Sequence, residues 1–219
     1  MRRIAAIAIA AGVIILVLVV AQLVLPGIAE DRLHDRLARS GQVLEVKVSA
    51  FPAIQLLWHD ADSVKVRLGR YRSSTGQIGS LLSDASGVDS IDASVQTFNS
   101  GLLTVHNASM RKRGDQLTGT ATVTEADLVR SFPILQSVQP VASGNGQLIL
   151  RGTASLLGVT GTVDATVGAQ DGKLVVQPNV PFGALATVTV FSNPHVYVEG
   201  VAATPAAGGF TVTVRAHMK

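Results

Sequence analysis

Residues 160–167, TGTVDATV, alternate between polar and apolar side chains. Small and apolar residues occupy one face of this stretch: Gly161, Val163, Ala165 and Val167. Polar residues occupy the other face: Thr160, Thr162, Asp164 and Thr166. Period-two alternation is typical of an antiparallel β-strand that is covered on one face only. The stretch therefore predicts a sheet that is buried on one side and solvated on the other.

The same alternation recurs along most of the chain, for example in residues 63–68, 116–123 and 210–215. Glycine-rich turn signals separate the predicted strands: Arg113-Gly114-Asp115, Ser143-Gly144-Asn145-Gly146, Asp171-Gly172 and Ala207-Gly208-Gly209. Such turns supply the backbone conformations that tight hairpins need. We expect about eight to ten strands.

The residues expected to face inward are small: Ala93, Gly119, Ala121, Gly152, Ala154, Gly161 and Ala165. Glycine inside a strand marks a bend or the close approach of another element, and curved sheets are built with such kinks. We therefore expect an α+β fold in which a long curved antiparallel β-sheet wraps around one or two short helices. Either acyl chains occupy the enclosed space, or a tightly packed helix fills it.

An amphipathic helix is expected over residues 27–40, followed by a stop at Gly41. Three apolar residues recur there at helical spacing: Ile28, Leu33 and Leu37. Two interpretations are open. The helix lies along lipid headgroups next to a membrane, or it packs its apolar stripe on the sheet as the first helix of the domain.

Two shorter helices are expected further along the chain. Residues 51–58 follow a predicted strand, and Pro52 suits a first helical turn. Residues 124–132 begin with Thr124 as N-cap and Asp127 at the capping-box position.

From Ile4 to Leu25 the chain carries no charge. As a helix this run is roughly 33 Å long, enough to cross a hydrocarbon core of about 30 Å. Because Arg2 and Arg3 precede it, the positive-inside rule predicts a cytoplasmic N-terminus and a domain on the outer side of the plasma membrane. We expect residues 1–26 to be a single-pass transmembrane anchor and residues 27–219 to be one extracytoplasmic domain. The alternative is a cleaved signal peptide, whose apolar region is usually only about 7–15 residues long.

Composition excludes several classes of function. The chain has no cysteine, which excludes disulfides, thiol nucleophiles, thiolate metal sites and a lipoprotein anchor. Without Arg2 and Arg3, 16 of the 18 basic residues remain against 15 acidic ones. A nearly neutral domain lacks the electrostatic field that nucleic-acid binding needs.

The sequence also lacks the patterns of an enzyme. Its five histidines have no metal-ligand spacing: His34, His59, His106, His195 and His217. It has no nucleophile elbow and no glycine-rich phosphate loop. The densest titratable group is His59, Asp60 and Asp62, and it fits a solvated turn better than an acid/base pair. We predict a protein that is not an enzyme and needs no metal or cofactor.

Three stretches carry a resemblance to a known family: VKVSAFPAIQLLWHDADSVKVRL (46–68), LTGTATVTEADLVRSF (117–132) and GQLILRGTASLLGVTGTVDATVGAQDGKLVVQP (146–178). In this order, and behind an apolar anchor with a short amphipathic helix, they resemble the LmeA-like family of bacterial envelope proteins. The chain departs from the family pattern where Trp58-His59-Asp60 stands in place of a common glycine.

The resemblance implies a phospholipid-binding protein of the cell envelope. It implies a fold similar to tubular lipid-binding domains, in which a long curved sheet wraps a helix and lipid lies between them. It also implies a phosphatidylinositol-type ligand and a role in lipoglycan maturation. Since an anchored carrier moves lipid only over the length of its tether, an envelope biosynthesis enzyme is an expected partner.

A lipid-binding protein needs an apolar slot for acyl chains and polar groups at its mouth. The slot candidates are Phe51, Ile54, Leu57 and Trp58, then Leu81, Leu82, Phe132, Ile134 and Leu135. The headgroup candidates are Arg67, Arg70, Arg72, Arg111, Lys112 and Arg113, because cationic side chains bind phosphate and anionic lipid surfaces. The slot candidates are explained equally well as ordinary core residues, and the headgroup candidates as residues of a solvated strand face.

A second function class remains open, a structural or interaction domain of the envelope without a bound ligand. It predicts a core filled by the protein's own side chains. A lipid carrier predicts a continuous apolar groove or tunnel between the sheet and a helix, which ends near the membrane-facing loops.

Overall fold

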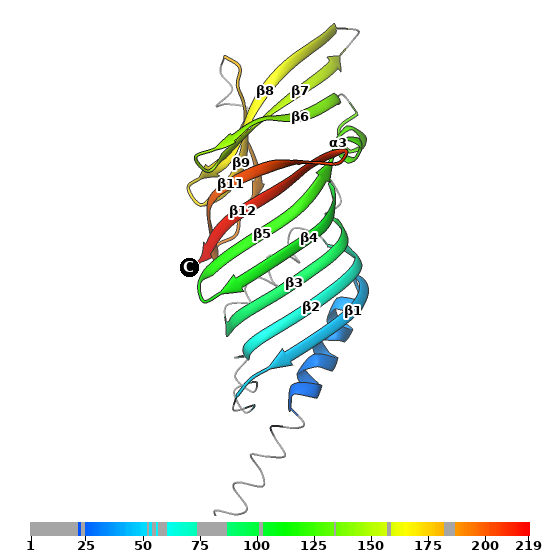
Figure 1. Ribbon diagram of the computed structural model, residues 1–219, viewed down its shortest axis with the longest axis vertical. Helices are drawn as coiled ribbons and strands as arrows, with labels where there is room; N and C mark the ends of the chain where they lie inside the picture. Colours follow the sequence, from blue (N-terminus) through cyan, green and yellow to red (C-terminus); the bar gives the residue numbers. More distant parts are fainter. Residues whose placement is uncertain are drawn as a thin grey trace, which may run out of the picture.

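The computed structural model describes residues 22, 25–51, 53, 56, 61–73, 87–100, 103–133, 135–156, 159–181 and 187–219. Their strands form two curved sheets, stacked along the long axis of the molecule (Figure 1). The seven-stranded sheet has the order β1 (Gly41–Ser49), β2 (Ala61–Arg72), β3 (Val88–Asn99), β4 (Thr104–Arg113), β5 (Gln116–Thr124), β12 (Gly209–Met218), β11 (Val196–Ala206). The five-stranded sheet has the order β10 (Val188–Phe191), β9 (Lys173–Pro178), β8 (Val159–Gln170), β7 (Gln147–Leu156), β6 (Leu135–Gly144).

One strand pair departs from the expected antiparallel arrangement. β2 runs parallel to β3, with Ala61 opposite Val88 and Arg72 opposite Asn99. Parallel neighbours need a crossover connection, and side-chain alternation does not indicate which neighbour a strand pairs with. The expectation of a wholly antiparallel sheet is therefore wrong at this pair, and the described residues contain twelve strands rather than eight to ten. The prediction of a mostly β fold with curved sheets is confirmed.

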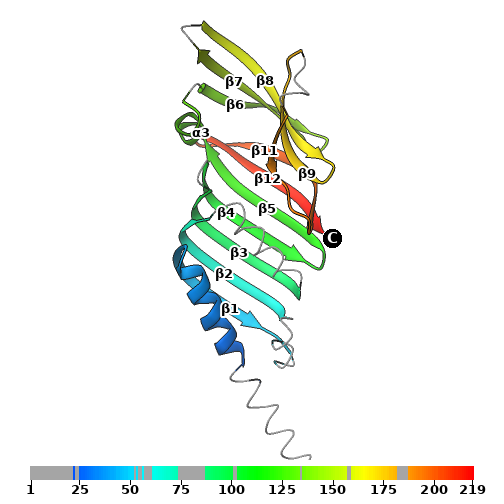
Figure 2. The ribbon, with the colours of Figure 1, turned by 180° about the vertical axis from the view of Figure 1, so that it is seen from behind.

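The helix of residues 25–38, here called the N-terminal helix, lies across one face of the seven-stranded sheet at β1 to β3 (Figure 2). Leu33 packs against the cluster around Val48 and Ile91, and Leu37 is buried with Val66. Ile28 is 43% exposed. The predicted stripe is thus confirmed at Leu33 and Leu37 and wrong at Ile28. Of the two interpretations of this helix, packing on the sheet is the one that the contacts support.

The predicted hairpin turns are confirmed by their backbone conformation. Asn145 and Gly146 have φ of 51° and 74°, and Asp171 and Gly172 have φ of 51° and 73°. Two successive positive φ values are the mark of a type I′ turn, which matches the twist of the strands that it joins.

The predicted N-cap is also confirmed. Helix α3 (Glu125–Ser131) begins after Thr124, whose hydroxyl accepts a hydrogen bond from the Asp127 backbone N–H at 3.1 Å. This bond satisfies one of the donors that a helix leaves open at its first turn. The short helix connects β5 of the seven-stranded sheet to β6 of the five-stranded sheet.

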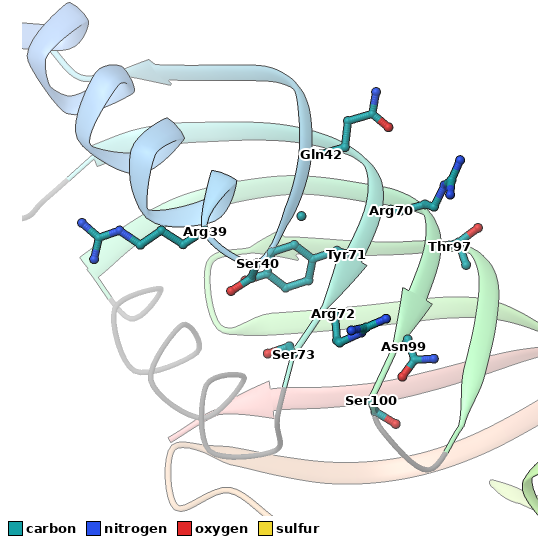
Figure 3. A pocket seen from close by; sticks show the side chains of 11 residues that line it. Arg39, Ser40, Gln42, Arg70, Tyr71, Arg72, Ser73, Thr97, Asn99 and Ser100 are labelled. Atoms are coloured by element: carbon teal, nitrogen blue, oxygen red, sulfur yellow. The ribbon is translucent and has the colours of Figure 1, made fainter.

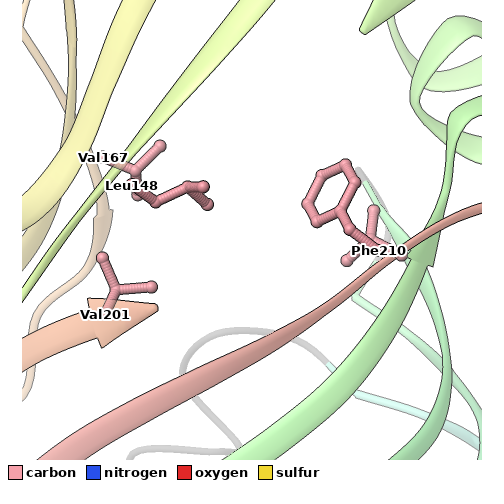
Figure 4. Packing of buried hydrophobic residues seen from close by; sticks show 5 residues of the cluster. Leu148, Val167, Val201 and Phe210 are labelled. Carbon is pink, nitrogen blue, oxygen red and sulfur yellow. The ribbon is translucent and has the colours of Figure 1, made fainter. Parts of the chain in front are cut away.

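β11 joins the two sheets. The Val201 N–H donates to the Gly146 carbonyl at 2.9 Å, and the Val198 N–H donates to the Gly172 carbonyl at 3.0 Å. Five side chains form a buried cluster at this junction (Figure 4): Val123, Leu148, Val167, Val201 and Phe210. The hairpin turns of the five-stranded sheet are thereby fixed to the edge of the seven-stranded one.

Most of the expected anchor, residues 4–21, lies outside the described residues. Within the described part of the chain, no helix is both long enough and apolar enough to cross a bilayer.

Candidate functional site

The five-stranded sheet has one apolar face, which follows from its register. Val163 and Val167 share a face of β8 by alternation. Val167 pairs with Val176 of β9, and Val176 pairs with Val188 of β10; directly paired residues share a face. We call this surface the inner face, and its members are Leu148, Leu150, Gly152, Ala154, Gly161, Val163, Ala165, Val167, Val176 and Val188.

The inner face is buried at the junction of the sheets and open away from it. Leu148 and Val167 are 1% and 8% exposed, because they belong to the junction cluster. Val163 is 41% exposed and Val188 is 61% exposed on the same face. The protein's own described side chains therefore leave part of a continuous apolar surface uncovered. Covering such surface is favourable by about 25 cal/mol per Å².

The opposite face of this sheet is polar. Arg151 and Asp164 form a two-bond ion pair there, with Nε to Oδ1 at 2.7 Å and Nη2 to Oδ2 at 2.8 Å. The hydrogen bonds from Arg151 lower the pKa of Asp164. A solvent-open pocket of about 480 Å³ lies beside this pair. Its lining is mostly polar, so it is unlike the apolar slot that lipid chains need.

Three of the predicted slot residues lie in the described chain. Leu135 is partly buried, and its side chain lies 3.7 Å from the position that a Cβ on Gly152 would take, so it covers the inner face. Phe132 follows α3 and is 45% exposed. Phe51 is 76% exposed. The others lie outside the described residues: Ile54, Leu57, Trp58, Leu81, Leu82 and Ile134.

Phe51 lies in a turn that polar side chains hold in place. The Phe51 N–H donates to Asp62 Oδ2 at 2.7 Å. The Gln22 carboxamide donates from Nε2 to the Ala50 carbonyl at 3.1 Å and accepts from the Ala53 N–H at 2.7 Å. The turn thus places an exposed aromatic ring next to the start of the N-terminal helix.

Four of the six headgroup candidates are engaged elsewhere. Arg67 Nε lies 3.4 Å from Glu45 Oε2, and Arg111 Nη2 lies 4.0 Å from Asp92 Oδ2. Arg113 Nη1 donates to the backbone carbonyls of Lys112 at 2.7 Å and Ile91 at 3.3 Å. Lys112 is 3% exposed and donates to the Val88 carbonyl, so it is not available to a headgroup at the surface.

Arg70 and Arg72, the remaining two, line a pocket of about 920 Å³ that is open to solvent (Figure 3). It lies where the N-terminal helix ends and β1 begins, beside the ends of β2 and β3. We call it the arginine pocket; Arg39, Tyr71 and Thr97 also line it. None of the lining residues that the structure describes is acidic. The Arg39 side chain points away from Arg70 and Arg72 (Figure 3).

Backbone contacts frame the arginine pocket. The Arg72 N–H donates to the Ser40 carbonyl at 2.9 Å, and the Ser73 N–H donates to the Asn99 carbonyl at 3.1 Å. A Cβ added to Gly41 would lie 2.3 Å from the Arg70 carbonyl oxygen, so only glycine allows β1 to approach β2 this closely. Sequence reasoning missed Arg39, because nothing in the chain indicates that the helix end folds back onto β2.

The most connected titratable group is Asp127, which is buried at the start of α3. Its carboxylate accepts from Thr124 Oγ1 at 2.5 Å and from Arg130 Nη1 at 2.6 Å, and His106 Nε2 lies 2.8 Å away. The Thr124 hydrogen bond, together with His106 and Arg130, lowers the pKa of Asp127, although burial opposes the shift. Asp127 lines neither pocket, and its contacts hold α3 against β4 and β5. In the described part of the chain, no group of three or more acidic or histidine side chains could hold a metal.

Comparison with known proteins gives one informative match. The model of a protein family described as LmeA-like phospholipid-binding matches residues 20–216. No curated protein matches the chain. Among solved structures, the Zhui aromatase/cyclase from Streptomyces is 14% identical over 48% of this chain and 67% of its own, with a TM-score of 0.20. A STAR-related lipid transfer protein from Xanthomonas axonopodis is 12% identical over 52% of this chain and 76% of its own, with a TM-score of 0.19. At these TM-scores neither likeness carries an argument.

Proposed function

Because this chain belongs to the LmeA-like phospholipid-binding family, we propose that the inner face of its five-stranded sheet binds the acyl chains of a phospholipid. The observation that carries the proposal is the exposure of Val163 and Val188 on the face that buries Leu148 and Val167. Acyl chains placed there would extend the junction cluster and remove its apolar margin from water. This arrangement is an open apolar surface rather than an enclosed tunnel.

Leu135 and Phe132 belong to the same proposed site. Leu135 lies over Gly152 on the inner face, and Phe132 is exposed three residues before it. Small residues such as Gly152 and Gly161 keep the sheet surface low, which leaves room for methylene chains. The slot roles of Ile54, Leu57, Trp58, Leu81, Leu82 and Ile134 remain predictions.

The proposal includes a membrane anchor at residues 4–25 and one outer domain at residues 27–219. The N-terminal helix begins at one end of the long axis, and β7 and β8 reach the other end (Figure 1). The Gln22 hydrogen bonds place the exposed Phe51 ring at the anchor end. An aromatic ring suits a membrane interface, so we assign Phe51 to contact with the bilayer rather than to the acyl slot.

The proposed role is carriage or presentation of lipid without catalysis, on the outer side of the plasma membrane. The description of the family as phospholipid-binding supports this role. A phosphatidylinositol-type ligand, lipoglycan maturation and an envelope enzyme as partner are the finer parts of this proposal.

The test is native mass spectrometry of the full chain in a neutral detergent. We expect about one phospholipid per chain in the unsubstituted protein. Val163→Asn with Val188→Asn should reduce bound lipid at least tenfold, because polar groups replace the proposed acyl contacts. Leu44→Asn is the control, since Leu44 is 51% exposed on β1 of the seven-stranded sheet and is not part of the inner face. A well-folded protein that binds no lipid, or equal loss in both variants, would contradict the proposal and favour a ligand-free interaction domain.

A further inference from the structure

We infer that the arginine pocket binds the phosphate of a ligand with net negative charge and no ammonium group. That the phosphate comes from an anionic phospholipid rests on the proposed function. The position of the site rests on the structure alone. Within the described residues, Arg39, Arg70 and Arg72 make no ion pair, whereas Arg67, Arg111, Arg130 and Arg151 each lie against a carboxylate.

The two central arginines are placed to act together. Arg70 and Arg72 are two positions apart on β2, and both are exposed on either side of the buried Tyr71. Residues two apart on a strand project to the same face. Guanidinium groups bind phosphate oxygens in pairs of parallel hydrogen bonds, which a single ammonium cannot do. Two neighbouring guanidinium groups therefore form a recognisable oxyanion site.

The floor and walls of the pocket are suited to a polar group. Tyr71 stacks on Phe98 with ring centroids 6.2 Å apart, which fixes the strand segment that carries both arginines. Thr97 pairs with Arg70 across β2 and β3, and Ser40 lies at the helix end, so hydroxyl groups line the pocket beside the guanidinium groups. Hydroxyl groups donate to phosphate oxygens and add to the arginine contacts.

The charge of the lining favours one class of lipid. Since no described lining residue is acidic, the ammonium group of phosphatidylcholine or phosphatidylethanolamine would lie beside arginines without a counter-charge. Like charges within a few ångströms disfavour binding. The pocket should therefore prefer anionic over zwitterionic phospholipids.

The position of the pocket bears on how the phosphate reaches it. At 1.5 Å per residue, the N-terminal helix separates the pocket from residue 25 by about 20 Å. Five strand spacings of about 4.8 Å separate β2 from β11 at the junction, and the inner face lies beyond it in the other sheet (Figure 1). A phosphate bound in the pocket therefore belongs to a lipid other than the one whose acyl chains cover the inner face, lifted from the bilayer that holds the proposed anchor, or to a soluble phosphate. Free phosphate and a lipid headgroup present the same chemistry, so the experiment includes both.

The experiment titrates the full chain, in a neutral detergent, with three probes: dihexanoyl phosphatidylglycerol, dihexanoyl phosphatidylcholine and inorganic phosphate. Binding is measured by calorimetry. The test variant is Arg70→Gln with Arg72→Gln. The control is Arg67→Gln with Arg111→Gln, which removes the same charge from exposed arginines that are ion-paired on β2 and β4. Circular dichroism checks that each variant is folded.

We expect phosphatidylglycerol to bind at least tenfold more tightly than phosphatidylcholine, and the test variant to lose this preference while the control stays within about twofold. If inorganic phosphate binds without either lipid, and the test variant loses this binding, the result would support the pocket as a site for soluble phosphate. If both variants lose this preference equally, the binding reflects diffuse charge attraction and the inference is overturned. The inference is also overturned if neither variant loses the preference. Failure of both lipids to bind would instead contradict the proposed function, so the two failures are distinguishable.

Discussion

Gly200 of β11 and Gly146 of the β6–β7 turn pack backbone against backbone, and a Cβ added to Gly200 would lie 2.9 Å from the Cα of Gly146. The Val201 N–H donates to the Gly146 carbonyl beside this contact. The contact lies at the junction of the two sheets, next to the buried side chains of Leu148 and Val201. The relative position of the inner face and the seven-stranded sheet therefore depends on the absence of a side chain at residue 200.

This contact predicts that Gly200→Ala lowers stability. The added methyl group meets backbone that cannot move without disturbing the junction, at a cost of about 1–3 kcal/mol. For a domain of this size, that change lowers Tm by several degrees, as thermal unfolding followed by circular dichroism would measure. Gly144→Ala in the same hairpin is the control, because nothing lies within 4 Å of its added Cβ. Equal Tm values for the two variants would contradict the backbone contact.

The Phe51 turn predicts a site of bilayer contact. Because the chain has no cysteine, a single fluorophore can be attached after Phe51→Cys or, as control, after Thr160→Cys on β8. In vesicles with nitroxide-labelled acyl chains, we expect quenching of the label at residue 51 and little quenching at residue 160. Equal quenching at both positions would place the turn away from the membrane.

The buried Asp127 predicts a pH-dependent contribution to stability. Its pKa is lowered in the folded protein, so the folded state binds this proton less readily than the unfolded state, in which the pKa is about 3.9. The stabilisation is therefore present above that pH and is lost as pH falls through the folded-state pKa. Asp127→Asn should reduce the free energy of unfolding by about 1–3 kcal/mol at neutral pH, because it removes a charge that accepts several hydrogen bonds.

The measurement for Asp127 is the difference in Tm between the unsubstituted protein and Asp127→Asn at several pH values from 6.5 to 3. The difference should shrink towards acid pH, because the Asp127 carboxylate is protonated first in the unfolded state and then, at lower pH, in the folded state. Other carboxylates affect both proteins and cancel. A difference that is independent of pH would show that the contribution of Asp127 is packing and not charge.

Local features of the fold could be predicted from the sequence because local chemistry determines them. Asn145-Gly146 and Asp171-Gly172 form the turns that their conformational freedom favours. Thr124 caps α3 as predicted, because its hydroxyl reaches the Asp127 N–H. The alternation of residues 160–167 predicts the two faces of β8, with Val163 and Val167 on the apolar side.

Long-range features could not be predicted in this way. The parallel pairing of β2 with β3 depends on a crossover, and alternation is the same for parallel and antiparallel neighbours. The slot prediction for Phe51 did not foresee its turn, in which the Phe51 N–H donates to Asp62, Gln22 binds the neighbouring backbone and the ring is exposed. Lys112 reads as part of a basic hairpin tip, yet it is buried against the Val88 carbonyl. The arginine pocket requires that the end of the N-terminal helix, with Arg39, lies beside Arg70 and Arg72 of β2.

The central claim is that acyl chains cover the inner face, and photocrosslinking tests it most directly. The full chain in vesicles would be loaded with a phospholipid that carries a diazirine on its acyl chain, irradiated, digested and mapped by mass spectrometry. We predict crosslinks at Val163, Ala165 and Val188 on the inner face, and none at Thr153 or Thr162 on the opposite face. Crosslinks on the threonine face, or crosslinks confined to Phe51 at the membrane end, would contradict the claim.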